Sequence, residues 1–329
     1  MNTSVSRRQI RSVALVINPH SGHGRGLAAA TAAAALFAEH GMRVREIRGA
    51  DAADTVALVR AAVQSADRPD AVVCAGGDGL VCVTVQALAG TDVALGLLPG
   101  GTGNDLAREL GVPKGDSRAA AEIVLGGVVR TIDLGVIEEP AGSDGPHPSD
   151  PAAVSTLPRP MRFATVAATG FDARVTLRAN RMRRPKGSLR YSCAAVPELL
   201  GQLAVPFRIE LSGGPEGTSP RVIETDAVMV AVGNTRTYGG GMLICPDAIL
   251  DDGLLDLTVV GAMSRAQLIR MLPALAAGRR VEHPAVTHHR AQAVTVAADV
   301  PATADGDPAE RLPATFRADP GALSVLVPH

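Results

Sequence analysis

The chain has 329 residues, of which 46% are apolar and only 2% aromatic, and its formal net charge at pH 7 is −1. This length is enough for two domains with full cores, and the even mixture of charges argues against a general nucleic-acid binder, which usually has a strong basic excess. No apolar run approaches the length of about 18 residues that a membrane-spanning helix needs.

The first 135 residues alternate between short apolar runs and Ala-rich stretches with helical spacing. The apolar runs are typical of buried parallel strands and lie at Val13–Ile17, Met42–Ile47, Ala71–Ala75 and Ala94–Leu98. The predicted helices are Leu27–His40, Asp54–Gln64, Leu80–Leu88, Leu106–Leu110 and Arg118–Leu125. This order predicts a three-layer, Rossmann-like α/β domain. The run Val129–Leu134 then carries the chain out of that domain.

Three of these strands are followed directly by glycine-rich loops. The loops are Asn18–Gly26, Gly76–Gly79 and Pro99–Asp105, and parallel strands bring such loops to one edge of the sheet. Glycines let backbone N–H groups approach phosphate oxygens, and a helix N-terminus adds positive partial charge. One such loop is equally compatible with a tight turn, but three together predict a nucleoside triphosphate site.

The acids in these loops need a separate explanation, because a carboxylate repels phosphate unless a cation lies between them. Asp78 and Asp105 are therefore candidates to hold Mg²⁺, directly or through water. Asp105 also lies at a loop–helix junction, where an N-cap role is equally consistent with the sequence.

The second half of the chain differs from the first in composition and in the pattern of its apolar residues. Residues 136–160 are rich in Pro, Gly, Ser and Asp and predict a mobile loop or insertion. Short β-rich runs over residues 161–329 then predict a largely antiparallel β-sandwich, whose last segment can pack back on the first domain. These runs are Phe163–Ala168, Phe207–Ser212, Val222–Gly233, Leu254–Val260, Ala293–Ala297 and Ala322–Val327. Helices are expected at Tyr191–Leu203 and Arg265–Ala276.

Motifs along nearly the whole chain resemble the diacylglycerol kinase catalytic-domain family, especially its bacterial soluble lipid kinases. In the first half these are NPHSG from Asn18, GGDG from Gly76 and PGGTGNDLAR from Pro99. In the second half they are ATGFDA from residue 168, YGGGMLICPDAILDDGLLDL from 238, ADGD from 304 and PGALSVLVP from 320. GGDG alone is shared with the related NAD kinases, whereas the third motif and DDGLLD are more specific.

The resemblance implies an ATP- and Mg²⁺-dependent kinase acting on a lipid hydroxyl, and it assigns roles to single residues. Asp305 would take the proton of the acceptor hydroxyl, assisted by Asp307. Asp133 would join the network around the active-site metal, and a structural Mg²⁺ in the second domain would be bound by Asp252 and the carbonyls of Ile249 and Leu254. The triphosphate site would include Asn18, Pro19, Ser21, Gly22, Gly76, Gly77, Asp78, Gly79, Thr102, Asn104 and Asp105. By sequence alone, Asp305 and the Asp251-Asp252-Gly253 segment are equally consistent with ordinary turns.

The chain departs from the family pattern in four places. Leu80 follows GGDG where Thr is usual, and His23, with Arg25 two positions on, stands where a basic residue often follows the first motif. Asp307 replaces the usual Glu and has a shorter reach, and residues 138–160 form an insertion.

A basic segment early in the second half contains no acid between Ala173 and Pro197. Such a cluster beside an apolar helix is typical of contact with anionic lipid, although it is also compatible with a solvated face or with a second subunit in a homodimer. Its basic residues are Arg174, Arg178, Arg181, Arg183, Arg184, Lys186 and Arg190.

We therefore expect a cytoplasmic protein, peripheral at the inner face of the membrane. The four Cys residues lack CxxC spacing, which fits a reducing compartment and indicates neither a zinc site nor a disulfide framework. The expected activity is phosphorylation of diacylglycerol, without nucleic acid as a partner. A sphingoid-base, ceramide or other long-chain alcohol kinase and a weakly catalytic nucleotide- or lipid-binding protein remain as alternatives.

Overall fold

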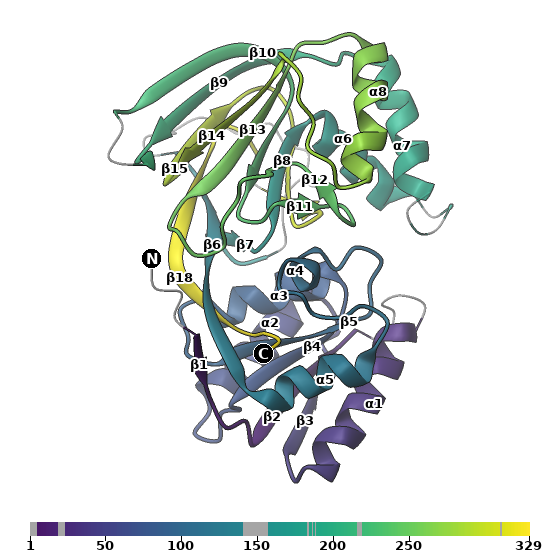
Figure 1. The fold of residues 1–329 in the computed structure, drawn as a ribbon, viewed down its shortest axis with the longest axis vertical. Coiled ribbons are helices and arrows are strands. Elements are labelled where there is room, and N and C mark those ends of the chain that lie inside the picture. The colour runs from purple at the N-terminus through teal and green to yellow at the C-terminus, as the bar shows by residue number, and fades with distance from the viewer. Residues whose placement is uncertain are drawn as a thin grey trace.

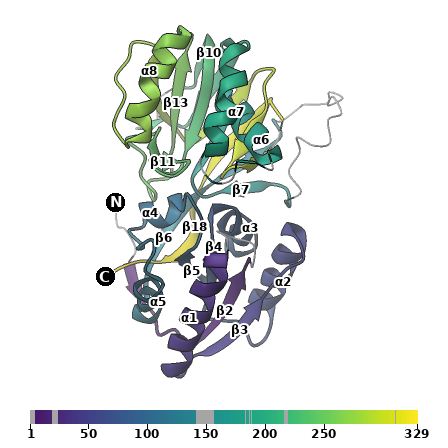
Figure 2. The same ribbon diagram turned by 90° about the vertical axis from the view of Figure 1, so that its right-hand side faces the viewer.

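A computed structural model describes residues 5–18, 24–140, 157–182, 184–185, 187, 189–215, 219–309 and 311–329. An α/β body and a β-rich body lie end to end and are joined by long strands (Figures 1 and 2). None of the helices in these ranges combines the length and apolar character needed to cross a membrane.

The α/β body is built on a parallel sheet with the strand order β3-β2-β4-β5. Helices α1 and α5 contact each other on one face and α2 and α3 on the other (Figure 2), so β2 and β4 are buried along their whole length. The strands are β2 (Ser12–Ile17), β3 (Arg43–Ile47), β4 (Ala71–Gly76) and β5 (Ala94–Pro99). The helices are α1 (Arg25–Glu39), α2 (Ala52–Gln64), α3 (Asp78–Leu88), α4 (Asp105–Glu109) and α5 (Ser117–Gly126).

Two long antiparallel strands connect the bodies. β6 (Val128–Glu138) and β18 (Ala314–Leu326) pair over most of their length, and Val325 of β18 also pairs parallel with Leu95 of β5. β1 (Val5–Arg7) pairs with β6. The C-terminal strand thus returns to the first body, and the two halves share one continuous 16-stranded sheet within the described residues.

The second body is antiparallel throughout, and three helices gather on one side of it (Figure 1). Helices α6 (Phe171–Arg181), α7 (Leu189–Leu200) and α8 (Arg265–Ala276) contribute to its separate hydrophobic cluster. Its longer strands are β8 (Val166–Gly170), β9 (Val205–Ser212), β10 (Arg221–Gly233), β13 (Leu255–Gly261), β14 (Val286–Ala291) and β15 (Ala293–Ala297). The short strands are β7 (Met161–Phe163), β11 (Thr237–Tyr238), β12 (Met242–Leu243), β16 (Ala302–Ala304) and β17 (Asp307–Pro308).

The predicted fold class is confirmed, with a parallel-sheet domain followed by a largely antiparallel β-sandwich. One predicted strand is wrong in detail: residues 163–168 belong to β7 and β8, because the amides of Ala164 and Thr165 between them donate to the Asp305 side chain and not to a strand. Helix α6 and strand β14 were not predicted. The predicted loop over residues 136–160 begins too early, because residues 136–138 belong to β6 and pair with β18. Residues 141–156 lie outside the described residues.

Candidate active site

The carboxylate of Asp78 joins two of the glycine-rich loops. Helix α3 begins at this residue directly after β4, and the side chain accepts hydrogen bonds from the backbone N–H of Asn104 at 2.7 Å and of Asp105 at 2.6 Å. Asn104 itself has a left-handed backbone and makes two side-chain hydrogen bonds to Gly101. The loops after β4 and β5 therefore form one hydrogen-bonded unit.

The glycines of this unit are required because the loops approach one another closely. A Cβ atom on Gly101 would lie 2.5 Å from Cα of Gly77, and one on Gly103 would lie 2.6 Å from Oδ2 of Asp78. A Cβ atom on Gly100 would lie 2.9 Å from Cα of Gly26, at the start of α1. Backbone therefore packs on backbone at the carboxyl edge of the sheet.

Leu80, the departure from the family pattern, packs its side chain over the same edge. A Cβ atom on Gly76 would lie 2.9 Å from Cδ2 of Leu80, and Leu80 contacts the main hydrophobic core. Its side chain thus fills space beside the strand end.

The predicted base lies in the tight turn between β16 and β17 and faces these loops. Asp305 has a φ of 50°, and its carboxylate accepts hydrogen bonds from the backbone N–H groups of Ala164 and Thr165, both at 2.8 Å. Burial raises the pKa of Asp305 to about 6, hydrogen bonds oppose the shift, and the like charge of Asp78 adds to it. The carboxylates of Asp78 and Asp305 therefore interact although 227 positions separate them.

Asp307 also lies where the two halves of the chain come together. A Cβ atom on Gly79 would lie 3.7 Å from Oδ2 of Asp307, and burial raises the pKa of this acid as well. The structure thus brings together the predicted base, its assistant and the GGDG loop.

Asp105 connects α4 to the second body. Its carboxylate accepts a hydrogen bond from the backbone N–H of Gly240 at 2.9 Å. Burial raises the pKa of Asp105 to about 6, and the charge of Asp78 contributes. Arg108 donates to the carbonyl oxygens of Gly103 and Gly240, at 3.2 and 3.0 Å. The glycine turn after β11 therefore contacts Asp105 and Arg108 at the end of the third glycine-rich loop directly.

Of the remaining predicted nucleotide residues, Asn18 lies at the end of β2, whereas Pro19, Ser21 and Gly22 lie outside the described residues. Thr102 lies in the loop after β5, where its carbonyl oxygen accepts a hydrogen bond from Nζ of Lys114 at 2.6 Å. Lys114 therefore places a cation beside this loop, and no sequence motif indicated this contact.

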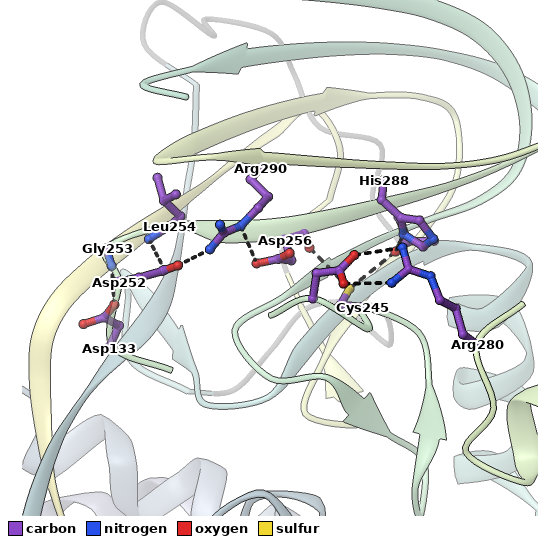
Figure 3. A network of polar contacts seen from close by, with 11 residues as sticks. Asp133, Cys245, Asp252, Gly253, Leu254, Asp256, Arg280, His288 and Arg290 are labelled. Atoms are coloured by element: carbon purple, nitrogen blue, oxygen red, sulfur yellow. Dashed lines mark hydrogen bonds and ion pairs between the residues drawn. The ribbon is translucent and has the colours of Figure 1, made fainter. Parts of the chain in front are cut away.

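Asp133 of β6 and Asp252 lie together at the turn before β13 (Figure 3). The carboxylate of Asp133 accepts hydrogen bonds from the backbone N–H of Gly253 and of Gly321, both at 2.7 Å. Asp252 contacts the guanidinium of Arg290 and accepts a hydrogen bond from the backbone N–H of Leu254 at 3.0 Å. A protein cation thus already contacts the carboxylate that was predicted to bind a structural Mg²⁺, and an ion at this carboxylate would have to displace it.

Comparison with known proteins gives consistent family matches in both halves. Residues 12–137 match the diacylglycerol kinase catalytic domain, and residues 165–327 match the YegS C-terminal NAD kinase beta sandwich-like domain. The diacylglycerol kinase of Mycobacterium tuberculosis (strain H37Rv) is 45% identical over 98% of this chain and 97% of its own. The chain belongs to the diacylglycerol kinase catalytic-domain family.

More distant matches agree with this assignment. The diacylglycerol kinase of Bacillus subtilis is 27% identical over 75% of this chain and 74% of its own. A crystal structure of a diacylglycerol kinase from Bacillus anthracis superposes with a TM-score of 0.72 at 20% identity, covering 98% of this chain and 99% of that one, and it supports the fold. The protein is therefore a lipid kinase.

Sequence reasoning missed a half-buried pair in this lipid kinase, Asp172 and Tyr238. Burial raises the pKa of Asp172 to about 6, while a hydrogen bond from the Tyr238 side chain opposes the shift. Asp172 lies in the first turn of α6, and Tyr238 directly precedes the glycine turn that contacts Asp105. Both residues fall inside quoted family motifs, but only their packing shows that they link α6 to this turn.

Proposed function

We propose that this lipid kinase transfers the γ-phosphoryl group of ATP, in the presence of Mg²⁺, to the free hydroxyl of diacylglycerol, giving phosphatidic acid and ADP. The proposal rests on one observation above all: the turn that carries the predicted base, Asp305, places Oδ2 of Asp307 where a Cβ atom on Gly79 of the GGDG loop would lie 3.7 Å from it. Phosphoryl transfer needs an acceptor that can lose its proton beside a positioned phosphate, and the proximity of this turn to the glycine loop supports both roles.

In the proposed reaction, the ionised carboxylate of Asp305 accepts the proton of the lipid hydroxyl. The acceptor oxygen then forms a bond to the γ-phosphorus, and the bond from that phosphorus to the β–γ bridging oxygen breaks. Asp307, beside Gly79, would help to orient the hydroxyl. The burial that raises the pKa of Asp305 also makes it a stronger base once it is ionised.

The glycine loops would hold the triphosphate through their backbone N–H groups. We assign this role to residues whose loops meet at the strand ends or were predicted with them: Asn18, Ser21, Gly22, Gly76, Gly77, Gly79 and Thr102. Pro19, which has no N–H, and Asn104, whose N–H donates to Asp78, would line the site without this contact. Mg²⁺ would offset the charge between phosphates and the carboxylates of Asp78 and Asp105. The like-charge interaction between these two acids supports a cation there.

The basic segment supports a further proposal, a peripheral position on an anionic inner membrane surface. Helix α7 exposes Leu189, Val196 and Leu200, whose exposed fractions are 59%, 57% and 76%. Glu198, however, pairs with Arg174 at 3.2 Å and with Arg178 at 2.7 Å, which leaves fewer cations for lipid. Co-sedimentation with vesicles that contain or lack anionic lipid tests this proposal, and equal binding to both would contradict it.

Labelled ATP tests the kinase proposal directly. The purified chain is incubated with Mg²⁺ and a mixed lipid extract, and labelled products are identified by mass, with Asp305→Asn as the control. We expect labelled phosphatidic acid from the wild type and at least about 10²-fold less from the variant. A labelled sphingoid or ceramide phosphate would change the acceptor, and no labelled lipid above the control would overturn the assignment.

A further inference from the structure

The turn Asp251-Asp252-Gly253 is held from three directions by the protein itself. Arg130 of β6 pairs with Asp251, with 2.9 Å between Nη2 and Oδ2. Asp133, also on β6, accepts the hydrogen bond of the Gly253 N–H at 2.7 Å. Arg290 reaches Asp252 from β14 (Figure 3). Each acid of this turn therefore pairs with an arginine.

Arg290 lies between two buried carboxylates. It stands opposite Asp256 in the β13–β14 register, and its Nε lies 3.3 Å from Oδ2 of that acid while Nη2 contacts Asp252. The side chains of Asp252 and Asp256 are only 2% and 8% exposed. A positive partner offsets the cost of burying two carboxylates side by side, and the planar guanidinium serves both from two edges.

We propose that the Arg290 guanidinium is the resident cation of this turn, in place of a structural divalent ion. Mg²⁺ needs short oxygen contacts in near-octahedral geometry, and to reach the Asp252 carboxylate it would have to displace Arg290. That displacement would leave Asp256 without its partner and place two cations side by side. The turn, and with it the position of Gly253 against Asp133, therefore does not depend on bound metal. This inference holds whatever the lipid acceptor is.

Thermal unfolding of the full chain without nucleotide tests the proposal, in EDTA and in millimolar MgCl₂. The Tm of the wild type is expected to be the same in both buffers. Arg290→Gln is expected to lower the Tm in EDTA by roughly 5–10 °C, because it leaves two buried carboxylates unpaired. Mg²⁺ should recover part of that loss, because the vacated space then admits a cation. The matched control is Arg280→Gln, which removes an ion pair with the half-exposed Asp247 and should show neither effect.

Two results would overturn the proposal. The first is a rise in wild-type Tm of several degrees with Mg²⁺ that Asp252→Asn abolishes, since a bound ion stabilises in proportion to its occupancy. The second is an Arg290→Gln variant that is as stable as Arg280→Gln or gains nothing from Mg²⁺. If neither Arg290→Gln nor Asp252→Asn folds, the wild type decides alone: an unchanged Tm supports the proposal and a rise with Mg²⁺ contradicts it.

Discussion

Two acid-containing glycine turns behave differently in this protein. Gly76–Gly79 places Asp78 where its carboxylate accepts backbone N–H groups and interacts with Asp105 and Asp305. In the turn Asp251–Gly253, both acids instead pair with arginines, Asp251 with Arg130 and Asp252 with Arg290. The local sequence specifies a turn in each case. Whether an acid remains available to a bound cation depends on residues far away in sequence, here Arg130 and Arg290.

The largest effect is expected from Asp78→Asn. The carboxylate accepts two backbone N–H groups, whereas an amide would turn its own NH₂ toward one of them, at Asn104 or Asp105. The loop after β5 would shift, and misalignment of this kind costs on the order of 10²-fold in kcat/KM. Initial rates of lipid phosphorylation measure it. Asp51→Asn, at the N-cap of α2, is the matched control, and a rate equal to that of the control would contradict the prediction.

Asp133→Asn should show the reverse balance, with a larger loss of stability than of activity. Its two carboxylate oxygens hold Gly253 and Gly321, and one of these N–H groups would face an amide donor in the variant. The expected fall in the free energy of unfolding is about 1–3 kcal/mol, measured by urea denaturation. Asp319→Asn, which removes a partly exposed pair with Arg162, is the control. A kcat/KM loss as large as that of Asp78→Asn would return Asp133 to the active-site network.

Hydrophobic periodicity predicted most of the fold because buried parallel strands have distinctive apolar runs. The prediction at Ala71–Ala75 matches β4 within one residue, and Arg265–Ala276 matches α8. It missed α6, which buries one face and carries basic residues on the other, and β14, whose sequence VTHHRA has four polar residues of six. Periodicity is a weak guide where an element is only partly buried.

The site was predictable as a set of residues but not as a set of contacts. The family motifs assigned Asp78, Asp305 and Asp307 to one site. In the structure these residues lie close together where the two halves meet, which agrees with that assignment. No local pattern indicated that Arg290 would reach Asp252, since the two lie on different elements 38 positions apart. Pairing of this kind depends on strand register, which motifs do not contain.

The pH dependence of kcat/KM tests which acid of the proposed active site, Asp305 or Asp105, must be ionised for activity. Asp305 has a pKa of about 6, and the proposed base can accept a proton only when it is ionised, so kcat/KM should fall about tenfold per pH unit below that value and be level above it. Thr165→Val removes a hydrogen bond that lowers this pKa, so the acid limb should move to higher pH. A limb that stays in place would assign it to Asp105, whose pKa is also about 6.

The smallest effect concerns the ion pair beside α4, between Arg236 and Glu109. Nε lies 2.9 Å from Oε1, but the Arg236 side chain is 52% exposed, so Arg236→Gln should lower the free energy of unfolding by only about 0.2–1 kcal/mol and raise the KM for ATP slightly. Arg118→Gln, which breaks an exposed pair within α5, is the control and should leave KM unchanged. The halves remain joined in the variant through the backbone of Gly240, which bonds to both Asp105 and Arg108. A loss of activity comparable to that of Asp78→Asn would mean that the ion pair, and not the glycine turn, aligns the second half with the phosphate loops.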